Sequence, residues 1–169
     1  WNLFWSPDSK KIAFINERQD INVITVATGE VENIDKTTTY TYNALQGFLM
    51  NWSPDSKWIT YTKQVSNLNG AIFLYSFEQK KLFQVTSGYY NDTRPSFDAT
   101  GKYLFFATDR SFAPSYSNLD GTWIYPNTTQ LAFVTLDPAT RSLLYARNDD
   151  VKVTDTSSAE KKPAPPAAT

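Results

Sequence analysis

Residues 5–10, Trp-Ser-Pro-Asp-Ser-Lys, decide the fold, because the same six letters return at residues 52–57. A weaker copy, Phe-Asp-Ala-Thr-Gly-Lys, fills residues 97–102. The three copies begin at Trp5, Trp52 and Phe97, which lie 47 and 45 residues apart. A fixed period of about 45 residues indicates a repeat architecture, in which each unit is one supersecondary element.

Each copy has the chemistry of a tight turn between two strands. The aromatic residue ends one strand, Pro or Ala follows, and the Asp and Ser side chains can bond their own backbone. An apolar segment comes directly after each turn, at residues 12–14, 58–61 and 103–106. The carboxylates of Asp8, Asp55 and Asp98 are therefore interpreted as turn caps rather than as cation ligands.

The second half of each unit repeats as well. Strand-like runs at residues 21–26, 71–76 and 130–135 each pass through a polar turn into a further extended segment. These last segments are residues 31–34, 81–85 and 142–145. Four strands in about 45 residues predict a β-propeller blade. The expected fold is all-β, with three four-stranded antiparallel blades that make about half of a six-bladed propeller.

The unit boundaries follow from the repeat. Residues 1–42 are predicted to form a blade whose first strand is truncated, and residues 43–88 the next blade. Residues 89–150 form a third blade that contains a long loop at 109–129. Residues 151–169 are rich in Pro and Ala and contain no large aromatic residue, which is typical of a disordered, low-complexity linker.

Three blades do not close a ring, because propellers have four or more. An open arc would expose apolar blade faces at both ends. Trp1 begins in a strand-like segment without an initiator Met. We therefore expect the remaining blades in sequence outside this chain, with self-association of the chain as the other way to cover its ends.

Composition excludes several classes of function. The 169 residues contain 16 Lys and Arg and 17 Asp and Glu, with no basic stripe, so a nucleic-acid partner is not expected. His and Cys are both absent. A Ser-His-Asp triad, an HExxH zinc site or a disulfide is therefore impossible within this chain. Apolar stretches have strand length, so membrane insertion is not expected; either a cytoplasmic or a periplasmic location fits.

No catalytic residue, cofactor or metal ligand is assigned, but one face offers a binding rim. In a blade, the connections between second and third strands and between blades share a face: residues 16–20, 36–45, 63–70, 88–94 and 109–129. Loops of about twenty residues are usually functional or disordered. Aromatic contacts and Arg–carboxylate pairing could hold an extended peptide here. The candidate rim residues are Tyr40, Tyr42, Tyr89, Tyr90, Arg94, Arg110, Phe112, Tyr116 and Trp123. The alternative is that Trp123 and Tyr125 simply begin the third strand and pack against a neighbouring blade.

The repeat resembles those of TolB-like and WD40-like propellers. Residues 105–112, Phe-Phe-Ala-Thr-Asp-Arg-Ser-Phe, and 116–131, Tyr-Ser-Asn-Leu-Asp-Gly-Thr-Trp-Ile-Tyr-Pro-Asn-Thr-Thr-Gln-Leu, resemble the amino-terminal propeller of tricorn-like proteases. The resemblance covers nearly the whole chain. It implies a large serine peptidase that trims peptides, in which this propeller filters or guides substrate. It also implies that a later propeller, a PDZ domain and a catalytic domain follow, and that the catalytic Ser and His lie there.

The resulting prediction is a non-catalytic propeller fragment that guides or gates peptide substrates. Its expected partners are peptides or a protein, together with the other blades and the catalytic domains of the parent. One alternative is a TolB-like interaction propeller without an enzymatic role. Another is the propeller cap of a prolyl-oligopeptidase-like hydrolase, which would need a GxSxG elbow elsewhere. A metal-dependent propeller lyase or lactonase is disfavoured, since such sites generally use His or clustered carboxylates.

Overall fold

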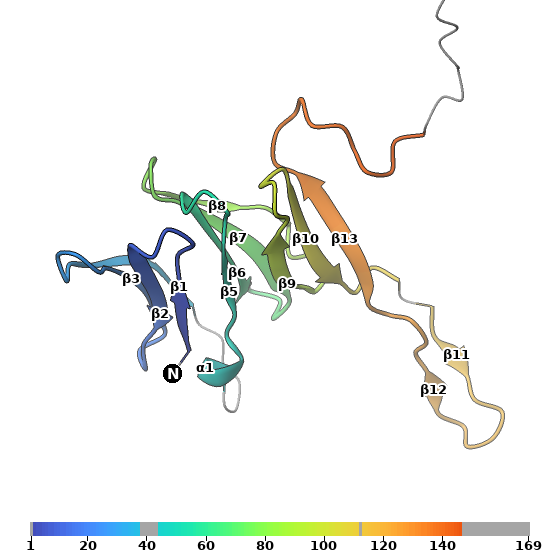
Figure 1. Ribbon diagram of the computed structural model, residues 1–169. Coiled ribbons are helices and arrows are strands. Elements are labelled where there is room, and N and C mark those ends of the chain that lie inside the picture. Colours follow the sequence, from blue (N-terminus) through green and yellow to red (C-terminus); the bar gives the residue numbers. More distant parts are fainter. Residues whose placement is uncertain (1, 38–43, 112, 147–169) are drawn as a thin grey trace, which may run out of the picture.

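The computed structural model describes residues 2–37, 44–111 and 113–146. Three sheets follow one another along the chain, each packed against the next (Figure 1). The first blade contains β1 (Leu3–Trp5), β2 (Lys11–Ile15), β3 (Asp20–Thr25) and β4 (Val31–Lys36), paired in that order. A one-turn helix, α1 (Ala44–Gly47), then leads into the second blade.

The second blade repeats this meander with β5 (Met50–Trp52), β6 (Trp58–Gln64), β7 (Gly70–Ser76) and β8 (Lys81–Gln84). The third sheet has the order β13-β10-β9, from β9 (Asp92–Phe97), β10 (Tyr103–Thr108) and β13 (Gln130–Thr135). A separate hairpin pairs β11 (Ser115–Tyr116) with β12 (Trp123–Ile124). All pairings are antiparallel, and the all-β blade prediction is confirmed.

The third blade differs from its prediction, because residues 142–145 do not form a fourth strand. They make a local turn, in which the Ser142 hydroxyl accepts a hydrogen bond from the Leu144 amide at 3.2 Å. The Tyr103 hydroxyl holds the carbonyl of Arg141 at 2.8 Å, and the Arg141 guanidinium lies 3.8 Å from the Tyr145 ring centroid. The contacts within residues 141–145 are local and compete with strand pairing, and the bond from Tyr103 adds a contact from a distant part of the chain. The linker predicted for residues 151–169 lies outside the described residues.

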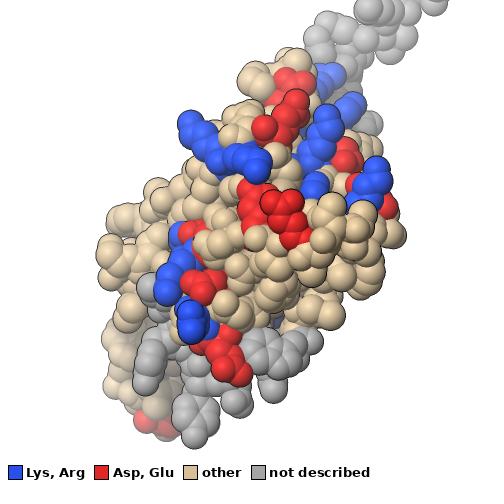
Figure 2. Space-filling view, turned by 90° about the vertical axis from the view of Figure 1, so that its left-hand side faces the viewer, with Lys and Arg blue, Asp and Glu red and all other residues tan. Residues whose placement is uncertain are grey.

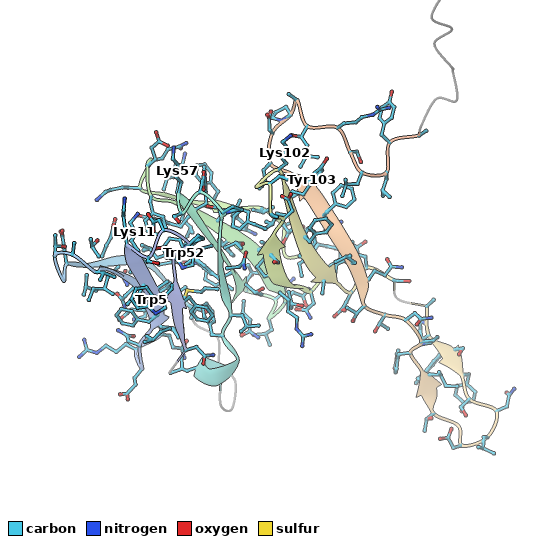
Figure 3. The ribbon with its side chains drawn as sticks, in the orientation of Figure 1. Trp5, Lys11, Trp52, Lys57, Lys102 and Tyr103 are labelled. Carbon is cyan, nitrogen blue, oxygen red and sulfur yellow. The ribbon has the colours of Figure 1, made fainter. Side chains whose placement is uncertain are left out.

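The repeated motif produces the same turn three times. Trp5 faces Ile12, Trp52 faces Ile59, and Phe97 faces Leu104 across their hairpins. The fifth residue of each motif, Ser9, Ser56 or Gly101, adopts a left-handed backbone with φ between 59° and 69°. Figure 3 labels Lys57 and Lys102, which end the second and third motifs, and Lys11, which begins β2 directly after the first. The sequence repeat therefore corresponds to a repeated hairpin in the structure.

The carboxylates of these turns cap their own backbone, as predicted. Asp8 accepts hydrogen bonds from the Ser6 hydroxyl at 2.6 Å and the Lys10 amide at 3.1 Å. Asp55 accepts the equivalent bonds from Ser53 and Lys57. The hydrogen bond from the Ser6 hydroxyl is the main cause that lowers the pKa of Asp8. Donors to the ionised form favour it, so these carboxylates serve the fold.

Asp98 gives this capping a measurable pH dependence. Partial burial raises the pKa of its carboxyl, but hydrogen bonds from Thr100 and from the Tyr103 amide outweigh burial and bring the pKa to about 2. In the unfolded chain an Asp takes up its proton near pH ~3.9. The unfolded state therefore binds more protons between those values, and the stabilisation by Asp98 is lost as the pH falls from about 4 to about 2.

Thermal unfolding of the Asp98→Asn variant tests this expectation. Its midpoint should lie below that of the unmodified chain at pH 5, and the two midpoints should converge as the pH approaches 2. The exposed acid Glu17, replaced by Gln, is the control, and it should leave the difference small at every pH. A gap between Asp98→Asn and the unmodified chain that stays constant from pH 5 to pH 2 would contradict the assignment.

Two apolar clusters fill the spaces between the sheets. The first joins the first and second blades through Ala13, Ile15, Val23, Tyr61 and Phe73, among others. The second joins the second and third blades through Ile72, Leu74, Leu104 and Phe106. Successive sheets thus pack face to face, as propeller blades do.

The outside of the first blade carries charges of both signs. Lys and Arg are interspersed with Asp and Glu on the face shown in Figure 2, so this face presents no field of a single sign. Among the described residues, no helix approaches the length and apolar character of a membrane span.

Candidate functional site

The candidate site lies where the connection into β9 meets the connection out of β10. Tyr89 and Tyr90 precede β9, and Arg110 follows β10. Because β9 and β10 are antiparallel partners, with Asp92 opposite Thr108, the start of one strand lies beside the end of the other. Two loops that are distant in sequence therefore present their side chains together.

Arg110 is the centre of this site. Its Nη2 lies 3.5 Å from Oδ2 of Asp92, and its Nε donates a hydrogen bond to the Thr108 hydroxyl at 3.0 Å. Its guanidinium carbon lies 5.2 Å from the ring centroid of Tyr90 and 5.9 Å from that of Phe106. The side chain is thus fixed from three sides, while 46% of it stays exposed.

The two side chains of the Asp92–Arg110 pair differ strongly in burial. The Asp92 side chain is 1% exposed, and its Oδ1 has no hydrogen-bond partner in the described part of the chain. A buried carboxylate needs a compensating cation, which Arg110 supplies. Arg110 keeps N–H donors beyond those that Asp92 and Thr108 engage, since a guanidinium carries five, and 46% of its side chain is exposed. The arrangement can therefore bind a carboxylate or carbonyl oxygen.

The two tyrosines add an exposed aromatic surface next to the guanidinium. Tyr89 and Tyr90 meet edge to face, with ring centroids 4.9 Å apart. Tyr89 is 75% exposed and Tyr90 is 40% exposed. We call Tyr89, Tyr90, Asp92, Phe106 and Arg110 the Tyr–Arg cluster. Such a combination of aromatic rings and a guanidinium suits an extended peptide.

Amide side chains hold the tyrosine loop in place. The Asn69 side chain donates to the carbonyls of Tyr89 at 2.9 Å and Gly88 at 3.2 Å. Gly88 has φ +76°, and a Cβ there would lie 2.5 Å from Cγ2 of Val65. The loop therefore needs glycine at this position, and the cluster rests on a defined backbone.

A second network joins this loop to the connection that leaves β10. The Asn91 side chain accepts a hydrogen bond from the Gly70 amide at 2.9 Å and donates to Asp109 at 3.1 Å. Asp109 also accepts a hydrogen bond from the Thr129 hydroxyl at 2.8 Å. Both ends of the segment 109–129 are thereby tied to the loop before β9.

The structure brings only some of the predicted rim residues together. Tyr89, Tyr90 and Arg110 form one cluster, whereas Tyr116 and Trp123 form another. Tyr40, Tyr42 and Phe112 lie outside the described residues. Arg94 is exposed on β9 with φ 54°, near a register shift between β9 and β10, and has no ion pair in the described ranges.

The segment 109–129, predicted as a loop, contains a hairpin that projects from the third blade (Figure 1). Tyr116 and Trp123 face each other across it, with ring centroids 5.6 Å apart, and both are more than half exposed. Tyr125 is also 52% exposed. The alternative that Trp123 and Tyr125 begin the third strand is wrong, because that strand is β13 and the hairpin forms by its own cross-strand pairing.

Sequence reasoning missed Asp92, Asn91 and Asp109. Their signal was weak, because Asp and Asn are ordinary loop residues and give no hint of burial. An acidic residue at the first position of a strand, opposite a strand that ends near an Arg, could have suggested the pair. In the described residues, no group of three or more Asp and Glu side chains is placed to hold a metal ion.

Comparison with known proteins gives consistent matches over this chain. The family model described as the tricorn protease second beta propeller domain matches residues 1–168. A protein of Sulfurisphaera tokodaii, described as a tricorn-like protease C-terminal subunit, is 36% identical over 110 residues, which are 65% of this chain and 12% of that protein.

Solved structures agree on the fold. A crystal structure of the tricorn protease superposes with a TM-score of 0.72 and 23% identity, over 83% of this chain and 14% of that one. The structure of TolB from Acinetobacter baumannii gives a TM-score of 0.51 and 24% identity, over 74% of this chain and 31% of that one. At these identities the likeness concerns the architecture of the blades.

Proposed function

The chain belongs to the family of tricorn protease second β-propeller domains, and from that premise we propose that it guides or gates peptide substrates for a serine-type peptidase. The predicted tricorn-like family is confirmed, and the matching model is that of the second propeller, where the sequence resemblance had indicated the amino-terminal one. The chain spans about an eighth or less of the length of its curated relatives. We therefore assign the proteolytic step to other parts of a parent protein. The remaining blades are also expected in that parent.

The Tyr–Arg cluster is the observation that carries this proposal. Two exposed rings and a guanidinium on a fixed loop offer a peptide an apolar surface and a charge-assisted hydrogen bond. The Arg110 side chain stays 46% exposed, whereas its carboxylate partner is buried. A peptide that ends in a free carboxylate should therefore be preferred over one that ends in an amide.

Binding of an N-acetylated tetra-alanine peptide to the chain tests this preference. We expect the form with a free carboxylate to bind about tenfold more tightly than its C-terminal amide, as a charge-assisted hydrogen bond at a half-exposed site allows. Isothermal titration calorimetry measures both affinities, in the unmodified chain and in each variant. The Arg110→Lys variant keeps the charge but loses the planar fork, so the preference should fall severalfold.

Arg18 supplies the matched control, since it is an exposed arginine on the first blade. Arg18→Lys should leave the carboxylate preference unchanged. Equal affinity of the acid and amide peptides, or a preference that survives Arg110→Lys, would refute peptide guidance by this cluster. Hydrolysis of any peptide by the chain alone would refute its non-catalytic role.

The projecting hairpin favours a second candidate function, a TolB-like docking propeller for a protein partner. Tyr116 and Trp123 form a compact exposed aromatic pair, the kind of surface that is enriched at protein interfaces. In that case Trp123→Ser would weaken partner binding, and Arg110→Lys would not. The two variants therefore separate the two functions.

A further inference from the structure

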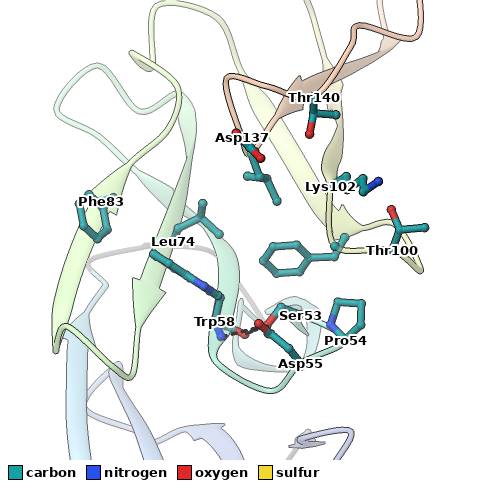
Figure 4. A pocket seen from close by; sticks show the side chains of 13 residues that line it. Ser53, Pro54, Asp55, Trp58, Leu74, Phe83, Thr100, Lys102, Asp137 and Thr140 are labelled. Atoms are coloured by element: carbon teal, nitrogen blue, oxygen red, sulfur yellow. Dashed lines mark hydrogen bonds between the residues drawn. The ribbon is translucent and has the colours of Figure 1, made fainter.

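A cavity of about 570 Å³ opens between the second and third blades, beside the repeated turns (Figure 4). Its walls are apolar, with Trp58, Leu74 and Phe83 on the second blade and Phe97 and Leu136 on the third. Asp55, Lys102 and Asp137 are among the polar residues at its border. Pockets that take small ligands have volumes of about 300 to 1,000 Å³ and mostly apolar linings.

The equivalent space between the first and second blades is filled by side chains. There the Phe77 ring stacks on Trp52, with centroids 5.0 Å apart and planes at 15°. Tyr75 contacts Phe77 edge to face at 5.2 Å, and the ammonium of Lys11 lies 4.5 Å from the Phe77 ring centroid. An aromatic ring from the second blade thus closes this space.

The same positions in the third blade carry smaller side chains. Equivalence follows from the backbone, because the Phe77 amide donates to the carbonyl of Lys57 and the Leu136 amide to that of Lys102, each lysine being the last residue of its motif. Leu136 thus takes the place of Phe77, and Phe97 that of Trp52. The volume of these rings is missing between the second and third blades, which accounts for the cavity.

Val134 extends the loss of volume. It pairs with Leu104 as Tyr75 pairs with Ile59, so it stands at the position of the Tyr75 ring. The opposite wall has become more aromatic instead. Trp58 and Phe83 lie there with ring centroids 6.0 Å apart, and both pack against the second apolar cluster. The cavity therefore combines one aromatic wall with one wall of short side chains.

Residues 141–146, which follow Thr140, do not line this cavity. The Tyr103 hydroxyl binds the Arg141 carbonyl, and Tyr103 contacts Phe105 and Phe133 on the other face of the third blade. Leu143, Leu144 and Tyr145 remain 53%, 84% and 58% exposed. Among the described residues, the anchoring of Arg141 thus keeps these side chains out of the cavity.

We propose that this cavity binds the aromatic side chain of a separate peptide. The incoming ring takes the place that Phe77 holds between the first two blades, against Trp58 and Phe83. The proposal rests on the assigned role in peptide handling, and it adds a preference for aromatic residues at a site distinct from the Tyr–Arg cluster. The ring in this pocket needs no free carboxylate, which separates the two sites experimentally.

Titration with acetyl-Ala-Phe-Ala-amide tests the pocket, with acetyl-Ala-Ala-Ala-amide as the blank. Burial of a phenylalanine side chain should make the first peptide bind about tenfold to a hundredfold more tightly. The indole N–H signal of Trp58, assigned through Trp58→Phe, should shift on addition of the aromatic peptide. Leu136→Phe restores the ring found at Phe77, so it should fill the pocket and abolish the difference between the peptides.

Two further variants keep the outcome clear. Phe97→Trp enlarges another side chain that lines the cavity, so it should also weaken aromatic binding. This variant keeps the test valid even if Leu136→Phe disturbs the fold. Val26→Phe makes the equivalent change on the first blade, where Val26 is 46% exposed, and should leave binding unchanged. Equal affinity of the two peptides, or aromatic binding that persists in both filled variants, would overturn the proposal.

The difference in affinity between the two blocked peptides distinguishes this result from the proposed function. Arg110→Lys should change the affinities of both peptides by the same factor, so the advantage of the aromatic peptide should remain, because Arg110 does not line the pocket. A second possible occupant is the chain's own Tyr145. If Tyr145→Ala shifts the Trp58 signal without any peptide, the pocket is filled from within and the proposal fails.

Discussion

Replacement of Trp52 by Ala is expected to lower the free energy of unfolding by about 3 to 5 kcal/mol, the usual cost of deleting a buried aromatic side chain. Trp52 is 7% exposed and stacks on Phe77. Its indole N–H also donates to the carbonyl of Phe4 at 2.9 Å, which joins the second blade to the first. The change removes both the packed ring and a hydrogen bond that crosses between two blades.

Trp5 offers a control with the same motif and the same turn. It is 54% exposed, so Trp5→Ala should cost less than a third of the Trp52→Ala effect. Denaturant unfolding at low protein concentration, followed by circular dichroism, measures both changes. Equal losses for the two variants would contradict the packing of successive blades, because only one of the two indoles lies between them.

The sequence predicted the repeated hairpins correctly, but it did not predict which segments pair into the third sheet. The motif at Trp5 and Trp52 located two hairpins with the same register, because turn chemistry acts within a few residues. Residues 142–145 have the composition of a strand but lack its pairing. That outcome depends on Tyr103 and Arg141, which are 38 residues apart, and no local pattern reports such a contact.

In the candidate site, too, the sequence indicated individual residues but not the contacts that depend on strand pairing. Tyr89, Tyr90 and Arg110 were predicted from the sequence as aromatic and charged groups on one face, and the structure places them together. Asp92, which orients Arg110, was not found, since its burial follows from the pairing of β9 with β10. The cavity could not be found either. It depends on Leu136 and Phe97 being smaller than Phe77 and Trp52 after the blades have packed.

Replacement of Asp35 by Ala is expected to cost about 3 kcal/mol, because it leaves a largely buried ammonium without its partner. Asp35 on β4 of the first blade accepts from Lys63 at 2.7 Å and from the Tyr61 hydroxyl at 2.9 Å, both on β6 of the second blade. The side chains of Lys63 and Asp35 are 19% and 12% exposed. Burial and the Asp35 charge raise the pKa of Tyr61, so its hydroxyl stays a donor.

A double-mutant cycle separates the value of the pair from the cost of breaking it. Lys63→Met removes the ammonium, which lies 4.5 Å from the Phe73 ring centroid, and leaves an apolar side chain that can pack on that ring. The double variant Asp35→Ala/Lys63→Met should be more stable than Asp35→Ala alone, because no unpaired ammonium remains between the blades. Glu78→Ala breaks the exposed pair with Lys57 and should cost less than about 1 kcal/mol. If the double variant is instead less stable than Asp35→Ala, then the Lys63 stem and charge stabilise the junction without Asp35, and the blades are joined there by packing rather than by the ion pair.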